Sequence, residues 1–357
     1  MLKKFVLIML VILRYHTVFA DDKAFLATVY TTVTTKHFTP VSAEEFAISG
    51  LKTLNNIDKN MTFADGRDMV YLYYKRQQAG LWHKPESADD AKQWAIISDK
   101  VIEKAVKVSY QAAKNKDKIA EKVVFSAVAA LDDNSRYFFA DEADKEPESE
   151  QLSIRHENNI LYVELRAFAP KTPTMLKNAF NRYPDAVAAI LDLRGNHGGQ
   201  LNAAIEIAKM FIDDGIIVST NEHNLDSAKF YISRSTQTIK LPLAILIDKD
   251  TASSAEMLAI ALQEQVQATL IGTLSYGKGT IQDTYIFDNG GRLALTTAKF
   301  FSPSGAEIEK RGITPDYCIL NDSTVKPENC IQQKRVGREF DIIFAKQILN
   351  RQLGRQN

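Results

Sequence analysis

The sequence lacks the features that would tie it to nucleic acid, to a metal ion or to a disulfide-dense scaffold. Its 357 residues include only two cysteines, too few for the small secreted folds that disulfides hold together. Its 44 basic residues are matched by 44 acidic ones, so no basic excess is present to neutralise a phosphate backbone, and no nucleic-acid partner is expected. CxxC and HExxH patterns are absent and the six histidines are scattered, so we expect no metal site and no other cofactor.

Residues 1–20 are typical of a secretory signal peptide. Lys3 and Lys4 precede an apolar run over 5–13, and small residues flank a cleavage point after Ala20. The run is too short to span a bilayer as a stable helix, and no later stretch of about 18 residues is apolar and uncharged. The sequence therefore predicts a periplasmic or otherwise exported protein, with no transmembrane span after signal removal. The charged residues that removal takes away are all basic, so the mature chain is slightly acidic.

The two cysteines, Cys318 and Cys330, lie close together near the C-terminus. In an oxidising compartment they would close a short loop and stabilise it, mainly by restricting the unfolded chain. Two free thiols are the alternative, and the spacing alone does not decide between them.

The pattern from about residue 40 to 133 is helical. Ser42 followed by Glu45 is typical of a capping box, and apolar residues recur at helical spacing in stretches that begin near Ser87 and near Lys118. We therefore expect an N-terminal helical domain over 21–140. Residues 141–150 are acidic and poor in apolar side chains, which predicts an exposed connector.

Short apolar strands alternate with helices over 151–320. Strands are expected at 160–168, 187–193, 216–218 and 241–247, and helices at 200–213 and 255–265. This alternation predicts an α/β domain with a mainly parallel sheet, in which an active site lies where strand ends meet helix starts.

Residues 321–357 form a C-terminal extension. The stretch 334–353 predicts an amphipathic helix that carries Phe340, Ile343, Phe344 and Ile348 on one side. This helix would dock on the chain's own core or on another subunit.

A glycine-rich turn follows the predicted strand 187–193. Residues 192–199 read DLRGNHGG, and Gly198 and Gly199 permit a sharp turn whose amides can bind a phosphate, a carboxylate or an oxyanion. A tight turn that only packs the helix on the strand is the alternative. Asp192 and Arg194 share one face of the strand, where an ion pair would brace the turn.

A turn of small residues follows the predicted strand 241–247. Residues 251–256 read TASSAE and place Ser253 and Ser254 at the start of a helix, where free amides favour a developing alkoxide or oxyanion. The alternative is that one of the two serines only caps the helix, with Glu256 in its first turn.

A lysine flanked by glycines occurs in residues 277–282, GKGTIQ. With Gly272 this segment nearly matches a phosphate-binding loop, but Gly279 replaces the hydroxyl that would bind the metal. An exported protein also rarely meets ATP, so no nucleotide site is expected. A lysine buried among apolar groups loses proton affinity and can act as a general base, whereas a surface lysine in a turn is the plain alternative.

Together the three segments supply a nucleophile, a base and oxyanion donors, the set that acyl transfer needs. In this order they resemble the carboxy-terminal processing, or tail-specific, serine peptidases, in which the lysine follows the serine by 25 positions, as Lys278 follows Ser253. The resemblance covers about residues 150–320 and includes 301–305 (FSPSG) and 312–316 (GITPD). Residues 131–138 (LDDNSRYF) are similar to the segment that precedes the family's PDZ module.

The resemblance implies a Clp-protease/crotonase-like spiral core and an exported serine endopeptidase that cleaves near protein C-termini with a Ser-Lys dyad. Ser253 would attack the peptide carbonyl, and Lys278 would take its proton and pass it to the leaving amine. Gln282 would hold the lysine amine in line. The amides of Gly198 or Gly199 and of Ser253 would bind the oxyanion.

The sequence also departs from the family. His197 stands where proline or glycine is usual, and Ala255 replaces a common second serine. The interval between Phe138 and Ile160 is too short for a PDZ module. Substrates with accessible C-terminal tails would then be recruited by the helical domain, by the C-terminal tail or by a partner such as a second copy of the chain.

Several alternatives stay open. Ser254 is a rival nucleophile, and His197 with Asp192 would give a Ser-His mechanism. A catalytically silent member that binds peptides or scaffolds a partner is a different class of function. An acyl-CoA enzyme of the crotonase type is disfavoured by export and by the intact serine and lysine.

Overall fold

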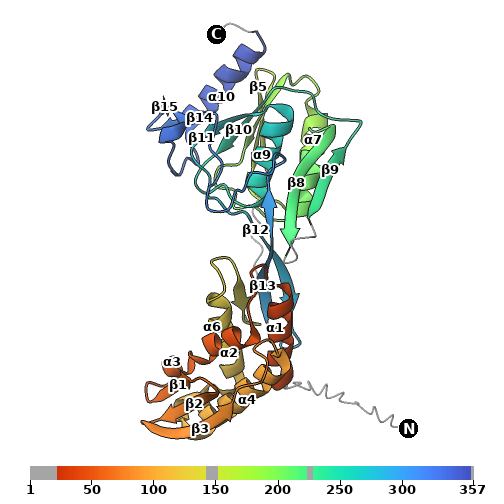
Figure 1. Cartoon of the computed structure of the whole chain (residues 1–357). Coiled ribbons are helices and arrows are strands. Elements are labelled where there is room, and N and C mark those ends of the chain that lie inside the picture. Colours follow the sequence, from red (N-terminus) through yellow and green to blue (C-terminus); the bar gives the residue numbers. More distant parts are fainter. Residues whose placement is uncertain (1–21, 142–151, 223–227, 355–357) are drawn as a thin grey trace, which may run out of the picture.

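The computed structural model describes residues 22–141, 152–222 and 228–354. Figure 1 shows two lobes joined by a narrow waist, with an N-terminal lobe formed from residues 22–141 and a C-terminal lobe formed from most of the remaining chain. The predicted signal peptide and almost all of the predicted acidic connector lie outside the described residues.

The N-terminal lobe is mainly helical, but it also contains a three-stranded antiparallel sheet that sequence analysis missed. Its helices are α1 Asp22–Lys36, α2 Ala43–Leu51, α3 Leu54–Ile57, α4 Ala91–Val108, α5 Tyr110–Lys114 and α6 Ile119–Ala129, with a 3₁₀ turn η1 at Lys116–Lys118. The sheet consists of β1 Met61–Asp65, β2 Met69–Tyr74 and β3 Gln77–His83. The aromatic and β-branched run in β2 favours a strand, and Lys75 and Arg76 adopt positive φ in the hairpin turn that follows.

Helix caps and apolar faces explain the helices of this lobe. The predicted capping box is present, because the Glu45 amide donates to the Ser42 hydroxyl and the Ser42 amide donates to the Glu45 carboxylate. Asp90 caps α4, which buries Trp94 and Val101 in the core of the lobe.

The C-terminal lobe is built on a seven-stranded sheet, which confirms the predicted α/β class. The strand order is β15-β14-β11-β10-β7-β6-β5, and its five central strands, from β14 to β6, are parallel. The strands are β5 Leu152–Glu157, β6 Ile160–Leu165, β7 Ala188–Asp192, β10 Leu243–Ile247, β11 Thr269–Gly272, β14 Tyr317–Leu320 and β15 Ser323–Val325. Antiparallel hairpins close both edges.

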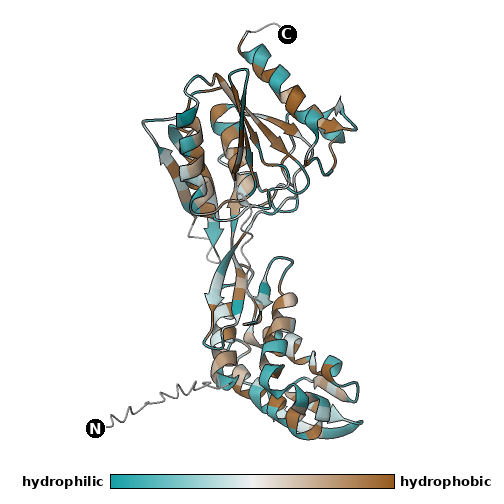
Figure 2. Cartoon of the chain, turned by 180° about the vertical axis from the view of Figure 1, so that it is seen from behind, coloured by the Kyte–Doolittle hydropathy of each residue, from teal (hydrophilic) through white to brown (hydrophobic). Residues whose placement is uncertain are grey.

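Helices cover both faces of this sheet, which explains why its central strands are hydrophobic throughout. The helices α7 Thr172–Arg182, α8 Leu201–Ala208 and α9 Ser254–Val266 pack on one face. The C-terminal helix α10 Glu339–Gln352 packs on the other face, after a 3₁₀ turn η2 at Pro327–Asn329. Figure 2 shows the hydrophobic strands enclosed between these helices.

The helix α10 therefore docks on the chain's own core, one of the two predicted alternatives. Its buried apolar residues are Ile342, Ala345, Ile348 and Leu349. Ile343, which was predicted on the apolar side, is 49% exposed, because the buried stripe is shifted by one position around the helix. The extension predicted at 321–357 thus supplies an edge strand and a covering helix of the C-terminal lobe.

A second sheet links the two lobes and changes the predicted domain boundary. It contains β8 Asp214–Glu222, β9 Lys229–Arg234, β12 Thr280–Ile286 and β13 Arg292–Phe301, and β13 also pairs with β4 Arg136–Phe138 of the N-terminal lobe. Figure 1 shows the β12–β13 hairpin running through the waist. Phe287, Leu293 and Leu295 pack in the core of the N-terminal lobe, so the far end of this hairpin belongs to that lobe, although its residues fall within the domain predicted at 151–320.

Two further features complete the fold. Cys318 and Cys330 form a disulfide, which decides between the two alternatives left by their spacing. Within the described ranges, the structure has no helix both long and apolar enough to cross a bilayer.

Candidate active site

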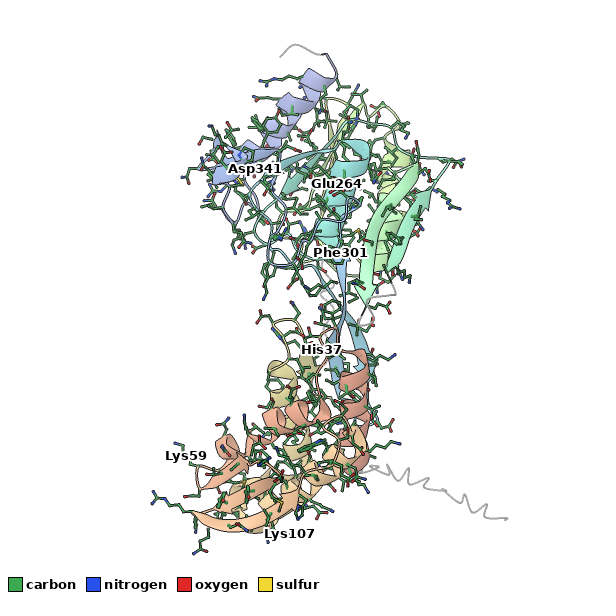
Figure 3. The ribbon with its side chains drawn as sticks, viewed as in Figure 1. His37, Lys59, Lys107, Glu264, Phe301 and Asp341 are labelled. Atoms are coloured by element: carbon green, nitrogen blue, oxygen red, sulfur yellow. A yellow bond between two sulfur atoms is a disulfide. The ribbon has the colours of Figure 1, made fainter. Side chains whose placement is uncertain are left out.

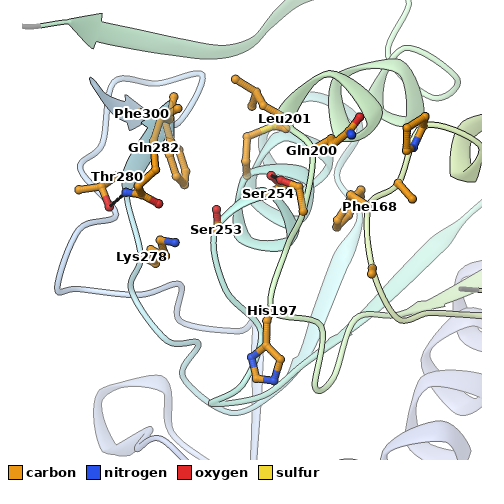
Figure 4. A pocket seen from close by; sticks show the side chains of 16 residues that line it. Phe168, His197, Gln200, Leu201, Ser253, Ser254, Lys278, Thr280, Gln282 and Phe300 are labelled. Atoms are coloured by element: carbon orange, nitrogen blue, oxygen red, sulfur yellow. Dashed lines mark hydrogen bonds between the residues drawn. The ribbon is translucent and has the colours of Figure 1, made fainter. Parts of the chain in front are cut away.

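The predicted chemical groups meet at one cavity of the C-terminal lobe. The cavity has a volume of about 530 Å³, and Figure 4 shows the side chains that line it. Ser253, Lys278, Gln282 and Gly199 all line this cavity, whereas Gly198 does not. Its remaining walls are mostly apolar and include Phe168, Leu201, Met257, Ile281 and Phe300.

Ser253 occupies the turn that leads from β10 into α9. Its φ of 56° lies in the left-handed region, which is uncommon for a residue with a side chain and typical of functional turns. Ser253 is partly exposed to the cavity. Ser254 is 4% exposed and its hydroxyl donates to the carbonyl of Gly199, so of the two candidate nucleophiles Ser253 is the more accessible.

The glycine turn offers fewer free amides than predicted. The Gly198 amide donates to the side-chain oxygen of Asn196 at 2.8 Å, and the Ser253 amide donates to Glu256 at 2.9 Å. Neither amide is therefore available for an oxyanion, which corrects two of the predicted donors. Gly199 lines the cavity, and its amide has no hydrogen-bond partner among the described residues.

Gly198 instead sets the position of the serine turn by close packing. A Cβ atom built at Gly198 would lie 2.9 Å from Ser253 Cβ and 2.9 Å from the carbonyl oxygen of Ala252. The φ of Gly198 is 99°, which also disfavours any side chain. Contact with the serine turn thus leaves no room for a side chain at position 198.

Lys278 faces Ser253 across the cavity (Figure 4), which excludes a surface lysine. Burial lowers the pKa of its amine. Glu309, Asp132 and Glu256 oppose this shift and Arg136 adds to it, with the net direction downward. Lys278 therefore gives up its proton more readily than an ordinary lysine, as a general base requires.

Glu256 joins the serine and lysine segments, a role that sequence analysis reduced to helix capping. Its buried carboxylate accepts hydrogen bonds from the amides of Ser253 and Lys278, each at 2.9 Å, and from the amide of Gly277 at 2.7 Å. The Ser275 hydroxyl donates to it as well. Burial raises the pKa of Glu256, and these four donors partly offset that rise.

The same amides show why the glycine-lysine segment is no phosphate loop. Gly277 and Lys278 donate to Glu256, and the Gly279 amide donates to Glu309 at 2.7 Å. The chain's own carboxylates thus occupy the amides that would cradle an anion.

Gln282 lies in β12, and its side-chain hydrogen bonds go to two threonines and not to Lys278. Its amide nitrogen donates to the hydroxyl of Thr280 at 2.9 Å and to that of Thr296 at 3.3 Å. Its amide oxygen points toward the side of the cavity that holds Ser253 and Lys278 (Figure 4). The predicted hydrogen bond between Gln282 and Lys278 is therefore not formed in this structure, although the oxygen faces the correct side.

The Ser-His alternative is not supported by the positions of its residues. His197 is exposed, and Figure 4 shows its ring pointing away from Ser253. Asp192 is buried and binds Tyr162 and Arg194 instead of His197. The predicted ion pair between Asp192 and Arg194 is confirmed.

A segment near the C-terminus holds the glycine turn in place, and sequence analysis gave no sign of it. Arg194 donates to the backbone carbonyls of Arg335 and Arg338 and to the carboxylate of Asp341. Burial lowers the pKa of Arg194, but its carboxylate partners outweigh that effect and raise the pKa above its ordinary value. All of these contacts span more than a hundred residues, so no local pattern in the sequence reveals them.

Comparison with known proteins agrees with this geometry. Residues 159–319 match the model of Peptidase family S41. A carboxy-terminal-processing protease of Bartonella bacilliformis is 37% identical over 175 residues, which are 47% of this chain and 40% of the relative. The carboxy-terminal processing protease CtpA of Bacillus subtilis is 35% identical over 161 residues, 44% of this chain and 34% of the relative. The chain thus spans less than half the length of these curated relatives.

The two-lobed fold also has a solved counterpart. A lipoprotein from Streptococcus agalactiae has a TM-score of 0.51 and 19% identity, and the match covers 88% of this chain and 98% of that protein. This likeness concerns the fold alone. The site geometry and the sequence matches lead to one conclusion: residues 159–319 are similar to Peptidase family S41, and the chain resembles the carboxy-terminal processing serine peptidases.

Proposed function

We propose that this chain is an exported serine endopeptidase that cleaves near the C-termini of other proteins through an acyl-enzyme intermediate. The observation that carries the proposal is the convergence of Ser253, Lys278 and Gly199 on one cavity. The disulfide between Cys318 and Cys330 supports export, because such bonds persist in oxidising compartments.

The chemistry follows from the positions of these groups. Neutral Lys278 takes the hydroxyl proton of Ser253 while the serine oxygen bonds to the scissile carbonyl carbon. The resulting lysine ammonium then protonates the leaving amine as the peptide C–N bond breaks. Water then attacks the ester carbonyl and gives a proton to the same lysine. The lysine returns this proton to the Ser253 oxygen as the ester bond breaks, which releases the acid product and free Ser253.

The oxyanion formed in both steps needs amide donors beside Ser253. Gly199 supplies one of them. We assign the second to the Ser254 amide, which opens helix α9 and has no hydrogen-bond partner among the described residues. It lies 3.1 Å from the place that a Gly198 Cβ would occupy, so it adjoins the glycine turn.

Substrate selection in this proposal depends on the cavity rather than on a PDZ module. Only residues 139–151 separate β4 from β5, too few for such a module. The apolar walls formed by Phe168, Leu201 and Met257 fit an aliphatic or aromatic substrate side chain next to the scissile bond.

The test uses a folded carrier protein with an unstructured tail fused at its C-terminus, and the same tail fused at its N-terminus as the matched substrate. We expect cleavage of the C-terminal tail by the unaltered protein and none by Ser253→Ala, measured by mass spectrometry. Equal cleavage of both substrates would contradict C-terminal specificity.

A serine-directed covalent probe separates the proposal from a catalytically silent peptide-binding protein. We expect labelling at Ser253 in the unaltered protein and in Ser254→Ala, and no label in Ser253→Ala. Peptide binding without any labelling would favour the silent protein, and labelling at Ser254 would reassign the nucleophile.

A further inference from the structure

We propose that Asp132 and Thr296 are positioning residues, which fix the amide of Gln282 so that its oxygen faces Lys278. This inference rests on the proposed function, because it gives Gln282 its part in that reaction. It also assigns a role to the segment 131–138, which lies outside the region that matches the peptidase family. The residues form a chain of hydrogen bonds from the N-terminal lobe to the cavity.

Asp132 is the fixed end of this chain, because it can only accept hydrogen bonds when it is ionised. Burial alone would raise its pKa. Hydrogen bonds from His37, from the Ser135 hydroxyl and from the amides of Asn134 and Ser135 outweigh burial and hold the pKa of Asp132 well below its ordinary value. The carboxylate is therefore ionised across the neutral range and is an obligatory acceptor.

Thr296 connects the Asp132 carboxylate to the cavity. Its hydroxyl lies 3.2 Å from Asp132 Oδ1, and its backbone amide donates to the Ser135 hydroxyl at 3.0 Å. The Ser135 hydroxyl proton is itself directed to Asp132 at 2.7 Å. The Thr296 hydroxyl donates to Asp132, which leaves the Thr296 oxygen as an acceptor toward the cavity. The Ser135 hydroxyl lies 3.3 Å from the same oxygen.

Gln282 meets that acceptor with its amide nitrogen, at 3.3 Å. Its other contact, with the Thr280 hydroxyl at 2.9 Å, does not select an orientation. That hydroxyl has no other partner in the described part of the chain, so it can either donate or accept. Thr296, with its proton committed to Asp132, is the contact that discriminates between the two orientations. The Gln282 oxygen is thereby directed to the cavity (Figure 4).

The orientation matters for the lysine base. When the Gln282 oxygen faces Lys278, it accepts a hydrogen bond from the lysine amine. The lone pair of the lysine nitrogen then stays free to take the Ser253 proton. A flipped amide would direct its NH₂ group at that lone pair, compete with the serine proton and disfavour the ammonium form. The charged groups that act on Lys278 are Glu309, Arg136, Asp132 and Glu256, and the Thr296 substitutions described below leave all four in place.

This chain of hydrogen bonds begins in the N-terminal lobe. His37, which Figure 3 places at the waist, follows helix α1 and is 3% exposed. Its Nε2 lies 2.8 Å from Asp132 Oδ2, and its Nδ1 lies 2.6 Å from the carbonyl of Thr39. The amide of Phe38 donates to the carbonyl of Thr296. The N-terminal lobe therefore helps to orient a residue of the active-site cavity.

The test compares Thr296→Val, which removes the hydroxyl at nearly constant shape, with Thr296→Ser, which keeps it. Thr297→Val is the matched control, because the Thr297 hydroxyl donates to Asp283 and not to this network. We expect kcat for tail cleavage to fall about tenfold in Thr296→Val, the effect of roughly one hydrogen bond, with KM unchanged. Thr296→Ser and Thr297→Val should keep kcat close to that of the unaltered protein.

A second measurement does not depend on activity. The titration midpoint of Lys278, followed by NMR of ¹⁵N-labelled lysine and assigned with Lys278→Ala, should shift downward in Thr296→Val and stay in place in Thr296→Ser. Thermal unfolding of each variant shows that it is folded.

The two measurements separate two kinds of failure. If the unaltered protein cleaves nothing, the proposed function fails, and the Lys278 titration still decides whether Thr296 orients Gln282. If Thr296→Val leaves both kcat and the Lys278 midpoint unchanged, the inference is overturned. An equal loss in Thr296→Ser would also overturn it, because the hydroxyl would then not be the group that matters.

Discussion

The serine side and the lysine side of the cavity are anchored in different parts of the molecule. Ser253 lies on a turn whose neighbours, Asn196, Gly198 and Glu256, all belong to the C-terminal lobe. Lys278 and Gln282 lie at the start of a hairpin whose far end packs in the core of the N-terminal lobe. The position of the proposed nucleophile therefore depends on one lobe, whereas the positions of the proposed base and its neighbour depend on both.

This difference explains where the family likeness stops. The matched region, residues 159–319, contains both sides of the cavity but not the part of the N-terminal lobe that contacts β13. The matched region thus contains the chemical groups, while the segments around His37 and Asp132, outside it, determine how the lysine side is oriented. We expect substitutions on the two sides to differ in whether they need contacts between the lobes.

The largest effect is expected on the lysine side. In Lys278→Ala, kcat should fall by about 10² to 10⁴, the usual contribution of a general base. Lys278→Arg should lose as much, because arginine keeps the charge but does not give up its proton at accessible pH. Steady-state kinetics on the tail substrate measure both variants. Activity retained in Lys278→Arg would show that charge alone matters and would remove the base from the mechanism.

The next effect is expected on the serine side. In Gly198→Ala the new Cβ would press on Ser253 Cβ and on the Ala252 carbonyl, and kcat should fall by about 10², as for a misplacement of about 1 Å. Gly305→Ala is the matched control, since Gly305 also has positive φ but a Cβ there meets nothing within 4 Å. Equal losses in both variants would mean that backbone strain, and not contact with the serine turn, is responsible.

A smaller effect is expected where the two sides meet. Glu256→Gln removes the charge that accepts from the amides of Ser253, Gly277 and Lys278, and leaves at least one of these donors poorly paired. The free energy of unfolding should fall by about 1–3 kcal/mol, with a parallel loss of kcat. Denaturant unfolding and kinetics of the same preparation measure the two. Lost stability with unchanged kcat would reduce Glu256 to a structural role.

The smallest effect on catalysis is expected away from both sides. Replacing Cys318 and Cys330 by serine opens a short loop and should lower the free energy of unfolding by about 3 kcal/mol. The kcat of the folded variant should match that of the unaltered protein. A large loss of kcat would show that the loop also positions the catalytic turns.

Local patterns predicted much of the C-terminal lobe. The alternation of apolar strands and helices gave the parallel sheet, because strands buried on both faces are hydrophobic throughout. The spacing between Ser253 and Lys278 identified two residues that the structure brings to one cavity. The β2 strand was missed because its aromatic residues lie within a region that otherwise has helical periodicity.

Contacts between distant segments could not be predicted from local patterns in the sequence. The partners of Arg194 near the C-terminus, and the link from Asp132 through Thr296 to Gln282, join residues more than a hundred positions apart. The glycine pattern predicts the Gly198 amide as an oxyanion donor, but in the structure this amide donates to Asn196. A glycine in a turn shows that the backbone can bend, but not which of its amides stays free.

The central claim, that Lys278 is the base for Ser253, is tested most directly by the pH dependence of covalent labelling at Ser253. Because burial lowers the pKa of Lys278, the labelling rate of the unaltered protein should rise with pH, with a midpoint below the ordinary range of a lysine amine. In Lys278→Ala that rise should disappear. A profile that is the same in both proteins would contradict the account.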